Sequence, residues 1–127
     1  MPCRPQRGGP AFARPIVFAV SLFAGFATFA SPAGTTSAER GRLLLAQYQC
    51  GSCHGIPGVA SAGGRLASSL KGFGARSYIA GRLANGPQAL ARWIQEPKAL
   101  VPDTLMPSMG VSPADARDMA AYLLELK

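Results

Sequence analysis

The sequence predicts an all-α fold of about four short helices, preceded by an N-terminal export signal. Apolar residues recur at helical spacing near both ends of residues 38–127, and no stretch alternates as a half-buried strand does. Segments rich in glycine and proline separate the helical patterns, which is typical of loops. At 127 residues the chain has room for one domain at most.

The first 33 residues have the three parts of a secretory signal peptide. Residues 1–15 hold three arginines and no acid, and residues 16–30 are apolar and uncharged. Small residues follow, so we expect cleavage near residues 30–33, with 34–37 as a linker. The alternative is an uncleaved anchor on the periplasmic face of the inner membrane, although this stretch is shorter than the roughly 20 residues that span a bilayer. We therefore predict a periplasmic protein, with membrane contact only if the segment is retained.

The charge of the chain gives no sign of nucleic-acid binding once the signal peptide is set apart. The formal net charge is +7, but three of the arginines lie before residue 16. The remainder holds ten Lys or Arg and six Asp or Glu, without a dense basic run or a basic patch interleaved with aromatics. A mildly basic surface of this kind favours at most the steering of an acidic protein partner.

Helices are expected at four places along the domain. The first begins with Thr36 as N-cap and a glutamate three residues on, the spacing of a capping box, and ends near Gly51. A second, short helix is expected over 77–83, in a region of mixed signals. The third covers 87–95, where apolar residues fall at i, i+3 and i+4 before a proline.

The last helix is the best defined by its sequence. Ser112 is a natural N-cap, Pro113 occupies the first helical position, and Asp115 lies favourably near the positive end of the helix. One face of this helix is apolar and includes Met119, for which we expect a role in core packing. The stretch 98–110 before this helix is expected to be irregular.

The most informative motif is Cys50-Gly51-Ser52-Cys53-His54, which matches the C-x-x-C-H attachment signature of c-type haem. Two thiols at this spacing can bond to both vinyl groups on one porphyrin edge, and the adjacent histidine then reaches the iron. A zinc site would need four ligands, whereas the whole chain has one histidine. A thiol–disulfide exchange site uses the same cysteine pair on a βαβ scaffold, which the strand-free pattern does not favour. We therefore expect one haem c attached through Cys50 and Cys53, with His54 as an axial ligand.

This motif and three later segments resemble the class I, mitochondrial-type cytochromes c of bacteria. The later segments are Leu90-Ala91-Arg92-Trp93-Ile94 followed by Pro97, then Thr104-Leu105-Met106-Pro107, and finally Ala120-Ala121-Tyr122-Leu123. Their order along residues 38–127 is more specific than the haem motif alone. The resemblance implies a mono-haem cytochrome c domain that carries electrons through an iron ligated by histidine and methionine.

The resemblance also implies roles for residues outside the haem motif. Met106 would be the sixth ligand of the iron, with Met109 in the same loop as the rival. Trp93, otherwise an ordinary core aromatic, would donate its indole N–H to a haem propionate. Arg76 and Tyr78 lie where family members carry other polar residues on the propionate side, and are otherwise surface or packing residues.

The chain departs from the family pattern at a place that concerns His54. Where the family has Gly-Pro-x-Leu, whose carbonyl accepts the histidine Nδ1–H, this chain has Gly63-Gly64-Arg65-Leu66. This segment can still supply the carbonyl, on a backbone loosened by the missing proline. Gly41 and Tyr122 are expected where the first and last helices cross, because a glycine lets two backbones approach closely.

The leading functional prediction is an electron carrier rather than an enzyme. An iron with both axial positions filled exchanges electrons and offers no site to a substrate. The expected partners are redox proteins: a periplasmic dehydrogenase, a quinol-oxidising complex or a terminal oxidase, met through small, weak interfaces. Two alternatives stay open, namely a haem subunit held permanently in a larger oxidase or dehydrogenase complex, and catalysis or gas sensing at an open iron.

Overall fold

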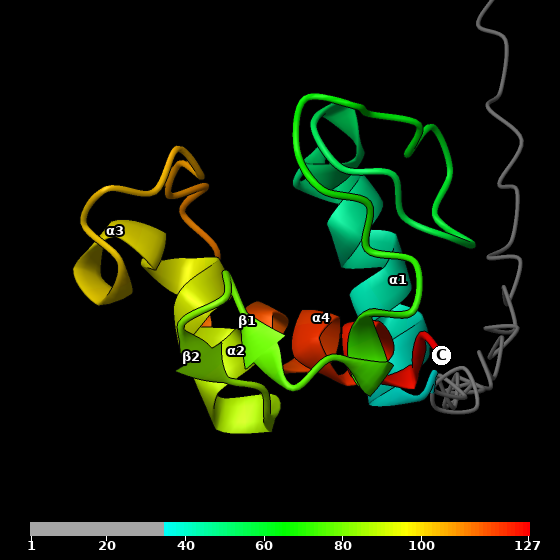
Figure 1. The fold of residues 1–127 in the computed structure, drawn as a ribbon. Coiled ribbons are helices and arrows are strands. Elements are labelled where there is room, and N and C mark those ends of the chain that lie inside the picture. The colour runs from blue at the N-terminus through cyan, green and yellow to red at the C-terminus, as the bar shows by residue number, and fades with distance from the viewer. Residues whose placement is uncertain (1–34) are drawn as a thin grey trace, which may run out of the picture. The chain divides into compact units, whose positions relative to one another are not determined.

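The longer helices of the domain pack around the last one. In the computed structural model, which describes Thr35–Lys127, the helices are α1 (Ser37–Gln47), α2 (Pro87–Gln95), α3 (Pro97–Leu100) and α4 (Pro113–Glu125). Between α1 and α2 lie two single-turn 3-10 helices, η1 (Cys50–Ser52) and η2 (Phe73–Ala75), and an antiparallel hairpin of β1 (Tyr78–Ile79) and β2 (Leu83–Ala84). Figure 1 shows α4 between α1 and α2, and it contacts both. The predicted signal peptide lies outside the described residues; among these, no helix is long and apolar enough to cross a membrane.

Both long helices begin at the capping residues that the sequence indicates. Thr36 Oγ1 accepts a hydrogen bond from the Glu39 N–H at 3.2 Å. Ser112 Oγ accepts one from the Asp115 N–H at 3.1 Å, and a proline occupies the first turn of α4. The observed bounds of α2 are also those predicted, 87–95. These starts were predictable because a cap acts within three residues of itself.

Gly41 allows α1 to cross α4 at very close range. A Cβ at this position would lie against the Asp118 carbonyl and 2.8 Å from the amide nitrogen of Met119. Because glycine has no Cβ, the two backbones meet without a clash, which confirms the prediction for Gly41. Tyr122, predicted at the same crossing, donates its hydroxyl to the Pro57 carbonyl at 2.7 Å. It thereby ties α4 to the loop that follows the haem motif.

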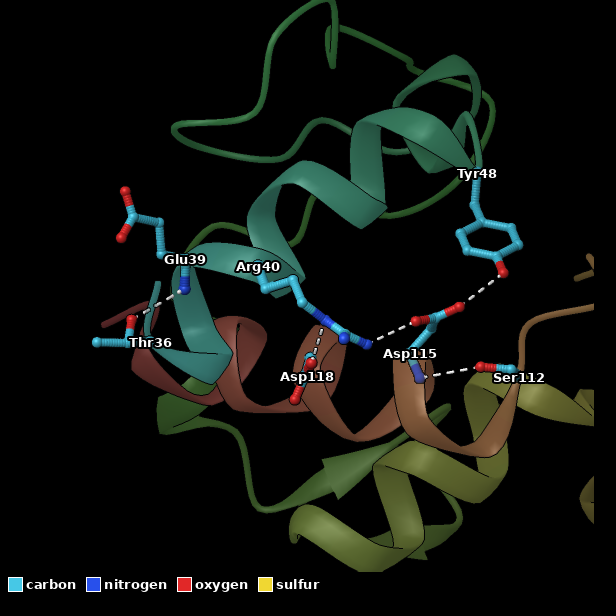
Figure 2. Close-up of polar contacts among 7 residues, drawn as sticks. All are labelled: Thr36, Glu39, Arg40, Tyr48, Ser112, Asp115 and Asp118. Carbon is cyan, nitrogen blue, oxygen red and sulfur yellow. Dashed lines mark hydrogen bonds and ion pairs between the residues drawn. The ribbon is translucent and has the colours of Figure 1, made fainter. Parts of the chain in front are cut away.

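A polar network links α1 to the first two turns of α4 (Figure 2). The Arg40 guanidinium donates to Asp115 at 2.7 Å and pairs with Asp118 at 2.5 Å. Tyr48, which follows the last residue of α1, donates its hydroxyl to the other Asp115 oxygen at 2.9 Å. This hydrogen bond is the main reason why the pKa of Asp115 is lowered and the pKa of Tyr48 is raised. We call these four residues the α1–α4 clamp.

The core forms where α1 and α2 meet one face of α4. Met119 on this face is fully buried, as predicted, and its neighbours Ala116 and Ala120 are at most 1% exposed. Side chains of α1, α2 and the hairpin also belong to the cluster, among them Leu44, Leu45, Ile79, Leu90, Trp93 and Ile94. Burying a leucine or isoleucine side chain stabilises a fold by about 1.5–3 kcal/mol relative to exposing it.

The short helix predicted over 77–83 is wrong, because this segment forms the β1–β2 hairpin. The hairpin pairs Tyr78 with Ala84 and Ile79 with Leu83. Ala80 and Gly81 at its turn have positive φ angles of 50° and 69°. Two consecutive residues of positive φ suit the twist of an antiparallel pair and end a helix. Alanine seldom adopts this conformation, so the sequence carried little signal for the turn.

The proline after α2 starts a helix as well as ending one. Irregular structure is predicted over 98–110, but the first three of these residues belong to α3. Pro97 stands in the first turn of α3, where its missing N–H costs no helical hydrogen bond. From Val101 to Ser112 the chain has no helix or strand, in agreement with the rest of the prediction.

Candidate functional site

The Cys50–His54 motif forms a tight turn just beyond α1. Gln49, with a left-handed φ of 56°, separates the helix from η1. The N–H groups of Cys53 and His54 both bond to the Cys50 carbonyl, at 3.3 and 3.0 Å. Both thiols are free and partly buried, and burial raises the pKa of the Cys50 thiol. The turn therefore holds two thiols and an imidazole within a short stretch of backbone.

His54 has one ring nitrogen committed to the protein. Its Nδ1 lies 2.7 Å from the Ser68 carbonyl oxygen, to which an Nδ1–H donates. This bond selects the tautomer whose Nε2 carries no proton and can ligate a metal. The accepting carbonyl belongs to Ser68 and not to residues 63–66, which the sequence left as a possible source.

The Gly63–Leu66 segment packs against the backbone of the motif instead. A Cβ at Gly64 would lie 2.5 Å from the carbonyl carbon of Cys53 and 2.6 Å from the Ser52 oxygen. The Gly64 N–H also bonds to a carbonyl of η1 at 3.0 Å. Because Gly64 already lies against the motif, the carbonyl that reaches the imidazole comes from further along the chain.

Residues 67–71, which we call the carbonyl arm, run beside the motif and are fixed to it by backbone hydrogen bonds. The Ala67 N–H bonds to the Cys53 carbonyl at 3.0 Å. The Leu70 N–H bonds to the Gly55 carbonyl at 2.8 Å. The carbonyl that accepts from His54 thus lies between two anchored residues.

Met106 lies in the loop between α3 and α4 and packs, partly buried, against the core. Its N–H donates to Thr104 Oγ1 at 3.2 Å. Met109, the rival ligand, is 44% exposed. In Figure 1 this loop (orange) and the segment 50–70 (green) lie toward opposite ends of the view. No hydrogen bond joins Met106 to His54 within the described residues, and the sixth-ligand role of Met106 stays a prediction.

Trp93 is buried in the core at 8% exposure. Within Thr35–Lys127 its indole N–H has no hydrogen-bond acceptor. The nitrogen is not among the fully buried polar atoms that lack a partner, so it keeps some access to solvent, and a carboxylate of a bound group would also be able to accept from it. The contact with a haem propionate stays a prediction.

Arg76 and Tyr78, predicted on the propionate side, have different surroundings. Arg76 Nη2 donates to the Ser69 carbonyl at 2.5 Å and to the Lys71 carbonyl at 3.3 Å. Its guanidinium also lies 5.4 Å from the centre of the Phe73 ring. Tyr78 in β1 is 59% exposed. Arg76 is therefore engaged with the carbonyl arm, a role that its sequence position does not indicate.

The chemistry of these residues fits a covalently held haem. Cys50 and Cys53 offer free thiols beside a histidine with an available Nε2. Three apolar side chains on the segments that carry the candidate ligands are exposed: Leu66 by 87%, Leu105 by 98% and Met109 by 44%. A large apolar group covering them would stabilise the domain by about 25 cal/mol per Å² of apolar surface buried. In the part of the chain that is described, no cluster of three or more His, Cys, Asp or Glu side chains could hold a bare metal ion.

Two contributors to the site were missed by sequence reasoning. Ser68 acts through its backbone carbonyl, whose direction no residue type encodes. Asn85 follows the hairpin, and its Nδ2 donates to the Phe73 and Arg76 carbonyls at 3.2 and 3.0 Å. Its Oδ1 is buried without a hydrogen-bond partner among the described residues. Nothing in the sequence pattern pointed to these long-range contacts of Asn85.

Comparison with known proteins gives a family and one curated relative. The model of the family described as Cytochrome c matches residues 38–127. Cytochrome c oxidase subunit 2 of Alkalihalophilus pseudofirmus is 34% identical over 93 residues, which cover 72% of this chain and 26% of that protein. The chain thus spans about a quarter of the length of this relative. No solved structure gives a significant match.

Proposed function

The chain belongs to the cytochrome c family, and on this premise we propose that it carries single electrons outside the cytoplasm. Family membership makes covalently bound haem c its cofactor and haem-based electron transfer its chemistry. We assign the two thioether bonds to Cys50 and Cys53, and the axial ligands to His54 and Met106. The observation that carries this assignment is the 2.7 Å contact of His54 Nδ1 with the Ser68 carbonyl, which leaves Nε2 for a metal.

The residues around the haem would hold and tune it. When bound, the haem supplies an iron that gains and loses one electron. His54 keeps one tautomer because Ser68 holds its Nδ1 proton, and this bond makes Nε2 a more basic donor. Met106 offers a soft thioether, which favours the reduced iron. The anchored carbonyl arm and the partly buried Met106 keep both ligands in place, so electron exchange requires little rearrangement.

An optical spectrum of the protein, exported with haem-attachment machinery present, tests the ligand pair. In the reduced protein we expect a sharp α-band. In the oxidised protein we expect a weak absorption band at the red end of the visible spectrum, which arises from the methionine–iron bond. Met106→Ala should abolish the ferric band and leave the haem attached, whereas Met109→Ala, from the same loop, should preserve it. The reverse result would reassign the sixth ligand, and a band that persists in both variants would exclude both methionines.

We further propose the periplasm as the compartment. The proposal is supported by the arginines, the apolar stretch and the small residues of 1–33. Sequencing the amino end of the mature protein tests it, with a start shortly after residues 30–33 as the expected result. A mature protein that still begins at Met1 would favour an uncleaved membrane anchor.

A second candidate function is that of a haem subunit held permanently in a respiratory complex. One observation favours it, since the relative that is 34% identical is named as a subunit of cytochrome c oxidase. A terminal oxidase is therefore the first partner to test, ahead of a dehydrogenase or a quinol-oxidising complex. Gel filtration of the native protein in moderate salt separates the candidates. A carrier elutes at the size of the free domain, whereas a fixed subunit elutes with the complex.

A further inference from the structure

We propose that Arg76 is a positioning residue for His54, acting through the carbonyl arm. The proposal rests on the assignment of His54 as an iron ligand and explains how the carbonyl arm, which contains no proline, is held in place. In place of a rigid ring in the backbone, a guanidinium from a neighbouring element holds the carbonyl arm from outside.

The first step is the grip of Arg76 on the carbonyl arm. Arg76 Nη2 donates to the Ser69 carbonyl at 2.5 Å, on the peptide unit next to the one whose carbonyl accepts from His54. A second contact, at 3.3 Å, reaches the Lys71 carbonyl. The side chain of Ser69 is held as well, because its Oγ accepts from the Lys71 N–H at 3.2 Å. With both its carbonyl and its hydroxyl engaged, Ser69 leaves the preceding carbonyl little freedom to turn.

The second step is the support of Arg76 itself. Its guanidinium lies over the ring of Phe73, which is only 5% exposed. The Arg76 carbonyl accepts from Asn85 Nδ2 at 3.0 Å, and the Phe73 carbonyl accepts from the same amide at 3.2 Å. Asn85, which directly follows β2, thus fixes the backbone from which Arg76 extends. A continuous set of contacts runs from Asn85 through Arg76 and the carbonyl arm to His54.

The third step is the consequence for the iron. A hydrogen bond from Nδ1 to a carbonyl raises the basicity of Nε2, which favours the oxidised iron. Loosening the carbonyl arm should therefore raise the reduction potential. Removing a nearby positive charge acts in the opposite direction, because a cation disfavours the more positive, oxidised state. The sign of the change separates positioning from simple electrostatics.

The test compares the haem-loaded wild type with Arg76→Gln, Arg76→Lys and a matched control, Arg82→Gln. Arg82 pairs with Asp103 at 2.9 and 3.2 Å, and none of its recorded contacts is with the carbonyl arm. The first readout is the rate at which the His54 Nδ1 proton exchanges with solvent, measured by NMR in the reduced protein. We expect exchange to be faster by about tenfold in Arg76→Gln and unchanged in Arg82→Gln. A rate in Arg76→Gln equal to that of the wild type would overturn the proposal.

The lysine variant keeps the test decisive if Arg76→Gln does not fold. An ammonium retains the charge but loses the planar contact with the Phe73 ring, so we expect exchange about threefold faster than in the wild type. An unchanged rate in Arg76→Lys would count against the proposal in the same way.

The reduction potential is the second readout, and a merely structural role would not give it a defined sign. We expect it to rise in Arg76→Gln and to stay level or fall in Arg82→Gln. A fall in Arg76→Gln at least as large as that in the control would show that only the charge matters. A wild-type protein without a histidine-ligated haem would contradict the ligand assignment instead, so the two proposals fail in distinguishable ways.

Discussion

Two regions of the molecule are held in place by different kinds of contact. The first, which we call the α1–α4 joint, is the crossing at Gly41 together with the buried face at Met119 and the α1–α4 clamp. The second is the carbonyl arm. In the joint the contacts depend on particular side chains: Gly41 admits a backbone, Met119 fills the core, and Arg40 pairs with two carboxylates. The carbonyl arm is held mainly through backbone groups, such as the Ala67 N–H and the Ser68 carbonyl. The contacts of the joint therefore depend on which residues are present, whereas those of the carbonyl arm depend mainly on the path of the backbone.

This difference separates stability from ligand geometry. The joint buries apolar side chains, so disturbing it should lower the free energy of unfolding. Ser68, Ser69 and Lys71 of the carbonyl arm are exposed, and a change there removes little apolar surface from the core. We expect alterations of the arm to act on the imidazole more than on folding. Three predictions, from the largest effect to the smallest, concern the joint.

Met119→Ala should have the largest effect. The side chain is fully buried, and truncating such a residue costs about 2–5 kcal/mol in unfolding free energy. Leu43→Ala is a suitable control, because Leu43 is 53% exposed on α1, and its change should stay within about 0.5 kcal/mol. Urea denaturation of the haem-loaded proteins measures both. A cost for Met119→Ala as small as that of the control would mean that this face of α4 is not the core.

Gly41→Ala should come next, with a loss of about 1–3 kcal/mol from the clash of its Cβ with the backbone of α4. The loss should appear even though alanine stabilises an isolated helix by about 0.5–1 kcal/mol relative to glycine. Gly63→Ala provides the comparison in the loop, since nothing lies within 4 Å of a Cβ built there. Thermal unfolding of the two variants tests the difference. Equal midpoints would contradict a close crossing at Gly41.

The smallest predicted effect is a dependence on pH that arises in the α1–α4 clamp. The pKa of Asp115 is lowered in the folded protein, so its carboxylate adds stability above the unfolded pKa. That stability is lost as the pH falls through the folded pKa. Tyr48 keeps its proton throughout this range, because its own pKa is raised. The Asp115→Asn variant should therefore have a lower denaturation midpoint than the wild type. This difference should be greatest near neutral pH and become smaller as the pH is lowered.

Asp103→Asn is the matched control for this pH dependence. Asp103 pairs with Arg82 on the surface, where the two side chains are 67% and 60% exposed. Exposed pairs of this kind contribute little to stability, so its deficit should be small at every pH. A deficit in Asp115→Asn that does not change with pH would show that the carboxylate is not responsible.

The features of the joint were predictable because each depends on nearby residues or on a repeating pattern. Thr36 and Ser112 cap helices within three residues of themselves, and the spacing of apolar residues along α4 placed Met119 in the core. The carbonyl arm was not predictable in this way. The carbonyl of Ser68 accepts from His54 because the path of the loop brings it there, and not because of its side chain. Ala80 lies at the turn of the hairpin with a positive φ that alanine rarely adopts.

The predictions for the haem site differ in the same way, between those that rest on a local motif and those that rest on long-range contacts. The motif at Cys50–His54 predicted haem c, and family membership confirms that cofactor. The roles of Met106 and Trp93 stay predictions, because their contacts would be made with a group that the polypeptide does not contain. The propionate-side role of Arg76 also stays a prediction, and its donors reach backbone carbonyls of the arm, which its position in the sequence did not indicate.

The crossing of α1 and α4 also sets an order of events in time. Arg40 and Asp115 meet across 75 residues of chain, and a polypeptide that emerges amino end first presents its cysteines long before α4 follows. During that interval α1, an isolated helix of 11 residues, is only marginally stable in water. The hydrogen bond between Arg40 and Asp115 and the packing of α1 on α4 can form only once the far end of the domain is present. A chain cut short before α4 should therefore leave α1 without its main packing partner.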